Sequence, residues 1–205
     1  MDQIKIAIVL GSTRPGRLGA SVARWVLELA KKRTDAQFEL VDVLDHDLPL
    51  LDEPGSPSQG IYTHEHTKRW SARIEAFDAF VFVTPEYNHG TCAALKNAID
   101  YLNKEWTNKV AGFVGYGAVG GVRAVEHLRL VMAELQVATV RAQVGLSLFT
   151  DFKNFEQFVP AAMHEQEVHT MLDQVVAWGA ALKPLRSGSI EEDHNVLLAE
   201  GIAND

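Results

Sequence analysis

The chain has 205 residues, of which 47% are apolar and 22% charged, and its net charge is −8. The length predicts one domain with a full hydrophobic core. The negative charge argues against nucleic acid as the main partner, because binding a phosphate backbone needs a clustered positive surface. No apolar segment approaches the roughly 20 residues of a membrane-spanning helix, so we expect no membrane partner. The opening residues lack a signal-peptide pattern and Cys92 is the one cysteine, which favours a cytoplasmic location.

Strand and helix patterns alternate along the chain. Apolar runs rich in β-branched and aromatic residues predict five strands, at residues 4–10, 38–44, 78–83, 109–114 and 138–148. Amphipathic patterns predict helices at residues 20–32, 64–77, 91–103, 122–136 and 165–183. Such alternation predicts an α/β domain over residues 1–184, with a five-stranded parallel sheet and helices on both faces. Of the common strand orders of such sheets, the order 2-1-3-4-5 is expected here. A long loop is expected at residues 45–63, and an acidic tail or arm at residues 185–205.

The loop after the first strand, residues 11–21, reads GSTRPGRLGAS. The helix that follows offers free N–H groups and a dipole that favour an anion. The loop also holds hydroxyl and guanidinium donors suited to phosphate, namely Ser12, Thr13, Ser21, Arg14 and Arg17. It lacks G-x-G-x-x-G, and Arg–Leu replaces the Lys–Ser/Thr of a P-loop, so a nucleoside-triphosphatase site is excluded. A phosphate site and a solvated connection with scattered arginines both stay open at this point.

Two further loops follow predicted strands and are unlike ordinary connections. Residues 84–90 read TPEYNHG, where Pro85 forces a turn. Backbone N–H groups of residues 86–88 can line the edge of a flat ligand and Tyr87 can stack on it, although the loop taken alone slightly favours a rigid turn with a surface tyrosine. Residues 115–121 read GYGAVGG, whose glycines permit close approach to a ring or simply a flexible helix entry. In the order 2-1-3-4-5 the three loops lie together beyond the carboxyl ends of the strands, where α/β sheets bind ligands.

Four segments carry a resemblance to a known family: IKIAIVLGSTRPGRLGASVARWV, VDVLDHDLPLLDE, DAFVFVTPEYNHGTCAALKNAIDYL and GYGAVGGVRAVEHLR. Through most of residues 4–129 the sequence resembles the NADPH-dependent FMN reductases, a flavodoxin-like family that includes quinone, azo and chromate reductases. G-S-x-R combined with T-P-E-Y-N and L-K-N-A-I-D is highly specific. The resemblance implies a flavodoxin-like fold, FMN as cofactor, NADPH or NADH as reductant and a small-molecule electron acceptor.

The resemblance also implies which residues hold FMN. Around the phosphate it implies Ser12, Arg14, Arg17, Gly19, Ala20 and Ser21. Along the isoalloxazine ring it implies Pro85, Glu86, Tyr87, Asn88 and His89, with Gly90 near the ring edge. On the other side of the ring it implies Gly115, Tyr116, Gly117 and Gly120. Which loop arginine contacts the phosphate stays open, and no residue is assigned a catalytic or metal-binding role.

The implied activity is hydride transfer from NAD(P)H to bound FMN, followed by reduction of a quinone, flavin, azo or similar acceptor at the same face. Two alternatives are a flavodoxin-type electron carrier and a flavin-sensing binding protein, neither with its own NAD(P)H activity. The resemblance further implies a homodimer, or a tetramer of two dimers, with contacts through residues 94–103 and 122–134. The apolar set on the second helix fits such a contact or the core equally well: Leu128, Val131, Met132 and Leu135.

Other chemically active side chains are given structural roles. His64 and His66 are expected on different faces of a helix, as surface residues rather than metal ligands. Cys92 opens a predicted helix and is expected to be a buried thiol.

Overall fold

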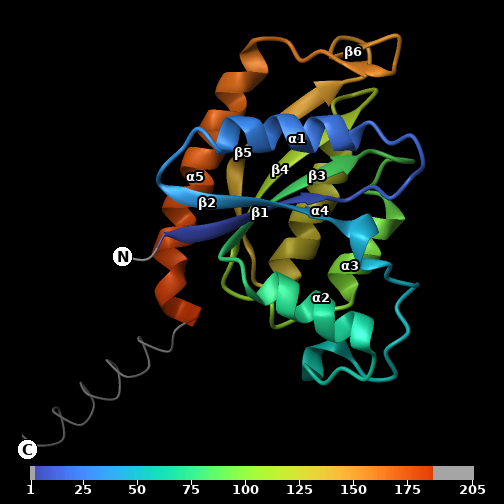
Figure 1. Cartoon of the computed structure of the whole chain (residues 1–205), viewed down its shortest axis with the longest axis vertical. Coiled ribbons are helices and arrows are strands. Elements are labelled where there is room, and N and C mark those ends of the chain that lie inside the picture. The colour runs from blue at the N-terminus through green and yellow to red at the C-terminus, as the bar shows by residue number, and fades with distance from the viewer. Residues whose placement is uncertain (1–2, 187–205) are drawn as a thin grey trace, which may run out of the picture.

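An open parallel sheet lies at the centre of residues 3–186, the part of the chain that the computed structural model describes (Figure 1). Its strands are β1 (Ile4–Leu10), β2 (Ala36–Asp42), β3 (Ala79–Pro85), β4 (Val110–Gly117) and β5 (Ala138–Ser147). Their order is β2-β1-β3-β4-β5 and every neighbouring pair is parallel, so the predicted fold is confirmed. All residues of β3 and β4 are buried, as expected for central strands covered on both faces.

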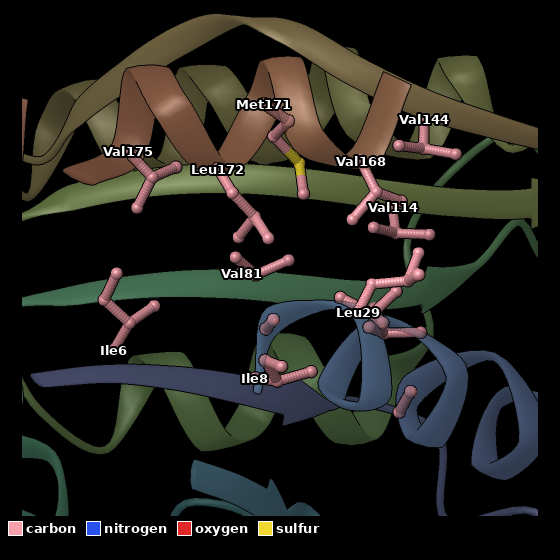
Figure 2. Packing of buried hydrophobic residues seen from close by; sticks show 14 of the residues in the cluster. Ile6, Ile8, Leu29, Val81, Val114, Val144, Val168, Met171, Leu172 and Val175 are labelled. Atoms are coloured by element: carbon pink, nitrogen blue, oxygen red, sulfur yellow. The ribbon is translucent and has the colours of Figure 1, made fainter. Parts of the chain in front are cut away.

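Helices cover both faces of the sheet. They are α1 (Gly19–Ala30), α2 (Glu65–Glu75), α3 (Ala93–Asp100), α4 (Val122–Glu134) and α5 (Met163–Arg186). Strand residues alternate between the faces, so Ile6 and Ile8 pack with α1 and α5 while Ala7 and Val9 face α2, α3 and α4. Figure 2 shows the first of these cores, where Leu172 and its neighbours on α5 point at the sheet. Each fully buried aliphatic side chain here stabilises the fold by roughly 1.5–3 kcal/mol.

The helix α5 ends later than its sequence pattern predicts. It continues past Lys183 to Arg186, whose guanidinium donates to the Asn108 carbonyl at 2.7 Å and pairs with Asp78. The expected boundary at residue 184 therefore falls inside a helix that is anchored to the domain. The rest of the expected tail, residues 187–205, lies outside the described residues.

Three expectations about connections need correction. The third loop begins later than expected, because residues 115–117 continue β4. The predicted second strand ends early at Asp42 and is followed by the 3₁₀ helix η1 (Val43–His46), and the long loop contains a second, η2 (Pro57–Gln59). The connection from β5 to α5, for which the sequence pattern predicted nothing, forms a small antiparallel hairpin of β6 (Phe152–Lys153) and β7 (Gln157–Phe158).

The apolar set proposed for α4 belongs to the core. Leu128 and Met132 are fully buried, and Val131 and Leu135 pack against the same cluster. Leu128 and Met132 are therefore not free to form a subunit contact, and Val131 and Leu135 are partly covered by the core. Within residues 3–186, none of the helices is both long and apolar enough to cross a membrane.

Candidate active site

A cleft of about 360 Å³ opens at the carboxyl ends of the strands, where the three unusual loops meet. The first loop, the second loop and the end of β4 all contribute residues to its lining, together with part of the β5–α5 connection. The lining residues are Arg14, Gly16, Arg17, Leu18, Pro85, Glu86, Tyr87, Tyr116, Gly117, Leu148, Phe155 and Glu156. The convergence expected from the strand order is thus present in three dimensions.

The first loop leads directly into the N-terminus of α1. Leu18 stands at the cap position, no side chain caps the helix, and its first turn contains no acidic residue. An uncapped N-terminus presents N–H groups and a partial positive charge to the cleft. The buried Ser12 hydroxyl lies at the base of the same loop and accepts from the Arg14 N–H at 3.4 Å. This end of the cleft is therefore suited to an anion.

The two arginines of the first loop have different surroundings. Arg17 is held by Asp42 at the end of β2, with Nη1 donating to Oδ1 at 2.7 Å and Nη2 pairing with Oδ2. The same Nη1 donates to the Ser12 carbonyl at 2.5 Å. The side chains of Arg17 and Asp42 are only 14% and 15% exposed, so this forked pair fixes the loop to β2.

Arg14, by contrast, is exposed at the rim of the cleft. Within residues 3–186 its guanidinium makes neither a hydrogen bond nor an ion pair. Of the two loop arginines, Arg14 is therefore the one whose donors are available to a ligand. The sequence leaves this choice open, because Asp42 is 25 residues from Arg17 in the chain.

Tyr116 and Gly19 supply a test of whether this end of the cleft fits a phosphate group. The Tyr116 hydroxyl is buried close to the Ser12 side chain and the Gly19 backbone, yet its geometry gives it no regular hydrogen bond to a described residue. Burial raises the pKa of Tyr116, so its hydroxyl keeps its proton and remains a donor. It lies against the start of α1, where a Cβ on Gly19 would come within 2.6 Å of it. An unpaired buried donor beside an uncapped helix start fits a phosphate ester well.

The second loop is fixed by Glu86, whose side chain is only 4% exposed. Its carboxylate accepts from the Arg123 backbone N–H at 3.0 Å and from Arg123 Nε at 2.5 Å, so it caps α4. Burial alone would raise the pKa of Glu86, but the hydrogen bonds from Arg123 hold that pKa below its ordinary value. The Glu86 side chain thus joins the second loop to α4 rather than lying free along the cleft.

The rest of the second loop forms a tight turn. The Glu86 N–H donates to the Tyr116 carbonyl at 2.9 Å and the Tyr87 N–H to the Gly90 carbonyl at 2.9 Å. Two of the three N–H groups expected to line a ligand are therefore already used inside the protein. Asn88 and His89 stand exposed with positive φ and are not among the residues that line the cleft, whereas Pro85 and Tyr87 line it.

The third loop contributes mainly through Tyr116 and Gly117. The backbone of Gly121 has φ +69°, and a Cβ there would lie 2.5 Å from the Tyr116 nitrogen, so glycine is required for the turn to close over β4. Gly115 and Gly120 lie behind this turn and do not line the cleft. Ser21 uses its hydroxyl to donate to the Leu18 carbonyl at 2.7 Å, inside the first turn of α1.

The cleft also has a wall that the sequence pattern did not predict. Leu148, Phe155 and Glu156 come from the β5–α5 connection. The one available signal was the sequence DFKNFEQF, in which apolar residues flank Asn154 at a potential turn. Without the fold, nothing indicates that this hairpin reaches the first loop.

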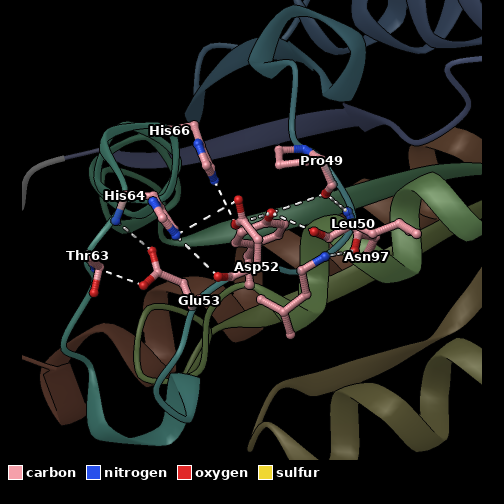
Figure 3. Close-up of polar contacts among 10 residues, drawn as sticks. Pro49, Leu50, Asp52, Glu53, Thr63, His64, His66 and Asn97 are labelled. Atoms are coloured by element: carbon pink, nitrogen blue, oxygen red, sulfur yellow. Dashed lines mark hydrogen bonds and ion pairs between the residues drawn. The ribbon is translucent and has the colours of Figure 1, made fainter.

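His64 and His66 lie together, contrary to the expectation of separate helix faces. Because α2 starts at Glu65, His64 precedes the helix, and the two rings stack with centroids 5.2 Å apart. Figure 3 shows both rings at Asp52, with His66 Nε2 3.0 Å from Oδ1 and His64 Nε2 3.2 Å from the carbonyl. Among residues 3–186 no group of three or more His, Cys, Asp or Glu side chains could hold a metal ion. The cluster fastens the loop at residues 45–63 to α2.

Cys92 is a buried thiol, as expected. It precedes α3 and is 4% exposed. Burial raises the pKa of its thiol, so the thiolate is disfavoured.

Comparison with known proteins gives a consistent result over most of the chain. Residues 4–151 match the family model described as NADPH-dependent FMN reductase. An NAD(P)H-dependent FMN reductase of Schizosaccharomyces pombe is 43% identical over 149 residues, which are 72% of this chain and 74% of the relative. A quinone reductase of Escherichia coli is 29% identical over 142 residues, 65% of this chain and 72% of the relative.

Solved structures show the same fold at lower identity. The flavoenzyme NAD(P)H:(acceptor) oxidoreductase FerB from Paracoccus denitrificans superimposes with a TM-score of 0.68 at 21% identity. The match covers 87% of this chain and 98% of that chain.

Proposed function

The chain belongs to the NADPH-dependent FMN reductase family, and from this premise we propose that it passes electrons from NAD(P)H, through FMN bound in the cleft, to a small-molecule acceptor such as a quinone. It is an oxidoreductase that uses FMN and NAD(P)H. The observation that carries the proposal is the cleft itself, where an uncapped helix start, a free arginine and an unpaired buried hydroxyl surround one position.

The phosphate end of FMN would be held by the first loop. Arg14 supplies a charged donor, Tyr116 a buried hydroxyl, and the start of α1 its N–H groups and dipole. Arg17 acts indirectly, because its pair with Asp42 keeps the loop in shape. We therefore assign Arg14 to the phosphate and Arg17 to positioning.

The ring end would rest on the second loop and the end of β4. Pro85, Tyr116 and Gly117 are buried at the bottom of the cleft, so they form a floor, while Tyr87 stands exposed at its edge. The Glu86–Arg123 pair fixes the distance between this floor and α4. Gly117 lets β4 pack closely against the second loop, since a Cβ there would approach the Glu86 Cβ at 3.1 Å.

Bound FMN supplies the redox chemistry, taking hydride from NAD(P)H and giving electrons to the acceptor. The protein has to place the two reactants in turn, keep the loops rigid and leave one face of the cleft open. The buried carboxylate of Glu86 is engaged with Arg123, and Asn88 and His89 lie outside the cleft lining. We therefore assign no proton-transferring side chain to the reaction.

We also propose a homodimer formed on the α3–α4 side, and a cytoplasmic location. Exposed apolar residues gather there: Leu50 (81% exposed) lies on the segment bonded to α3, and Leu130 (73%) lies on the outer face of α4. Light scattering coupled to size exclusion tests the dimer. Leu130→Glu should shift the mass toward a monomer, and an unchanged dimer would remove α4 from the interface.

The function is tested by reconstitution and turnover. The purified chain should bind one FMN and oxidise NADPH or NADH only in its presence, with naphthoquinone, free flavin or azo dye as acceptor. A protein that takes up no FMN, or that takes it up and leaves both nucleotides unoxidised, would contradict the proposal. The ratio of kcat/KM values across the acceptors and both nucleotides would identify the preferred pair.

A further inference from the structure

Phe155 is the one aromatic side chain that the β5–α5 connection contributes to the lining of the cleft. It stands at the tip of the β6–β7 hairpin with 56% of its surface exposed. Phe149 lies edge-on to it, with ring centroids 5.6 Å apart and an interplanar angle of 83°. Exposing a phenylalanine ring to water costs free energy, and a ligand that covers the ring removes this cost. Two such rings beside a binding cleft therefore need an explanation.

The backbone at the tip makes the choice of phenylalanine more unusual. In the turn from Lys153 to Glu156, which is closed by the Glu156 N–H donating to the Lys153 carbonyl at 3.1 Å, both central residues have positive φ. Asn154 has φ +55° and Phe155 φ +59°. Asn–Gly is the ordinary pair for such a turn, since a bulky residue is disfavoured in the left-handed region. Phe155 thus occupies a position where glycine would be more stable.

The base of the hairpin is rigid, so the ring is held at a defined place. Phe152 is 4% exposed and packs against Phe158 with centroids 5.1 Å apart. Phe158 in turn packs edge-on against Trp25 of α1 at 5.5 Å. Asp151, buried just before the hairpin, accepts from the Ala161 N–H at 3.0 Å and lies 3.1 Å from His164 Nε2. The hairpin is therefore fastened to both α1 and α5.

Burial separates the floor of the cleft from its rim. Pro85, Tyr116 and Gly117 on the floor are buried, whereas two aromatic residues of the lining, Tyr87 on the second loop and Phe155 on the hairpin, are exposed. A flavin resting on the floor would leave the rim rings to contact whatever lies above it. Two aromatic side chains at the rim favour binding of a flat, aromatic ligand over a compact, strongly hydrated one.

We propose that Phe155 is a specificity-determining residue, whose ring forms a wall for planar aromatic electron acceptors bound over the flavin. This inference rests on the proposed function. It predicts that the side chain acts on planar acceptors such as quinones and has no effect on a compact, hydrated acceptor such as ferricyanide. It further predicts that removing the ring does not lower stability, because a glycine or asparagine relieves the strained turn and offsets the lost contact with Phe149.

The turn itself offers a matched set of variants. Phe155→Gly removes the ring and installs the favoured Asn–Gly pair, so it should fold at least as well as the parent. Phe155→Asn removes the ring with a second residue that tolerates positive φ. Asn154→Gly changes the same turn but keeps the ring, and it serves as the control.

Binding is measured first, without turnover. 2-Methyl-1,4-naphthoquinone is titrated into the oxidised, FMN-loaded protein in the absence of NAD(P)H, and the Kd is read by calorimetry. Phe155→Gly and Phe155→Asn should weaken this Kd by about three- to tenfold, the range of one aromatic contact. Asn154→Gly should match the parent, and neither the affinity for FMN nor the Tm should fall in any variant.

Turnover then supplies the specificity readout. The ratio of kcat/KM for the naphthoquinone to that for ferricyanide should fall by the same factor in the two ring-less variants only. Unchanged naphthoquinone binding in both would overturn the inference. So would a parallel loss of FMN affinity, which would mean that the ring covers the flavin. If the parent oxidises no NAD(P)H the proposed function fails, while the binding titration still decides the role of Phe155.

Discussion

Replacing Glu86 by glutamine should both destabilise the fold and loosen the cofactor cleft. The carboxylate is 4% exposed and accepts two hydrogen bonds from Arg123, through the backbone N–H at 3.0 Å and Nε at 2.5 Å. Hydrogen bonds to a charged group contribute about 1.5–3 kcal/mol each. Because the Arg123 side chain is 43% exposed, the side-chain bond belongs at the low end of that range.

Glutamine keeps one acceptor oxygen but turns its NH₂ group toward a donor, so Glu86→Gln should lower the free energy of unfolding by about 2 kcal/mol. Arg123→Ala should lower it by about 1 kcal/mol, because the carboxylate then still caps α4 through the backbone. Lys96→Ala, which removes an exposed pair with Asp100, is the control and should change stability by less than about 0.5 kcal/mol.

The assay is urea unfolding followed by tryptophan fluorescence between pH 7 and pH 3.5. The pKa of Glu86 is lowered in the folded protein, so its stabilisation is complete above the ordinary carboxyl pKa near 4.5 and is lost as the pH falls through the lowered value. The difference between parent and Glu86→Gln should therefore be constant from pH 7 to pH 5 and shrink at lower pH. A Glu86→Gln variant as stable as the Lys96→Ala control at pH 7 would refute the role given to this pair.

Three other changes test separate parts of the structure. Arg14→Ala should weaken the Kd for FMN by roughly tenfold with an unchanged Tm, whereas an equally tight, fully yellow variant would remove Arg14 from the phosphate site. Tyr116→Phe should weaken FMN binding by about two- to tenfold. The free energy of unfolding of the FMN-free protein should stay unchanged or rise, since the lost hydroxyl has no partner within the described chain. A less stable FMN-free variant would contradict this. Burial lowers the pKa of Lys109 to about 8, so the unfolded chain binds more protons above that value and stability should rise from pH 8 to 9.5, by at most about 1.4 kcal/mol per pH unit. In Lys109→Met that rise should disappear in urea unfolding, and a rise of the same size would point to another group.

The sequence predicted the structure best where the local residue pattern alone determines a strand. Apolar runs with β-branched residues identified the central strands, and the strand order brought the first, second and third loops together. The family resemblance rested on the same loops and is confirmed. The strands are local features of the chain, and their positions could therefore be predicted from composition and spacing.

Features that depend on distant partners could not be predicted. The position of the Arg17 side chain depends on its ion pair with Asp42 at the end of β2. The orientation of the Glu86 carboxylate depends on its hydrogen bonds to α4 rather than on its own loop. The pairing of His64 with His66 depends on where α2 begins and on Asp52 from the preceding loop. The hairpin that carries Phe155 has strands of two residues each, too short for a period-2 pattern.

The most direct test of the central claim is anaerobic reduction of the FMN-loaded protein by NADPH or NADH in a single cuvette. One equivalent of nucleotide should bleach the oxidised flavin band, at roughly 450 nm, and added naphthoquinone should restore it. The same protein carrying Arg14→Ala should show this response only when FMN is supplied in excess. A flavin band that stays unchanged with both nucleotides would contradict the account.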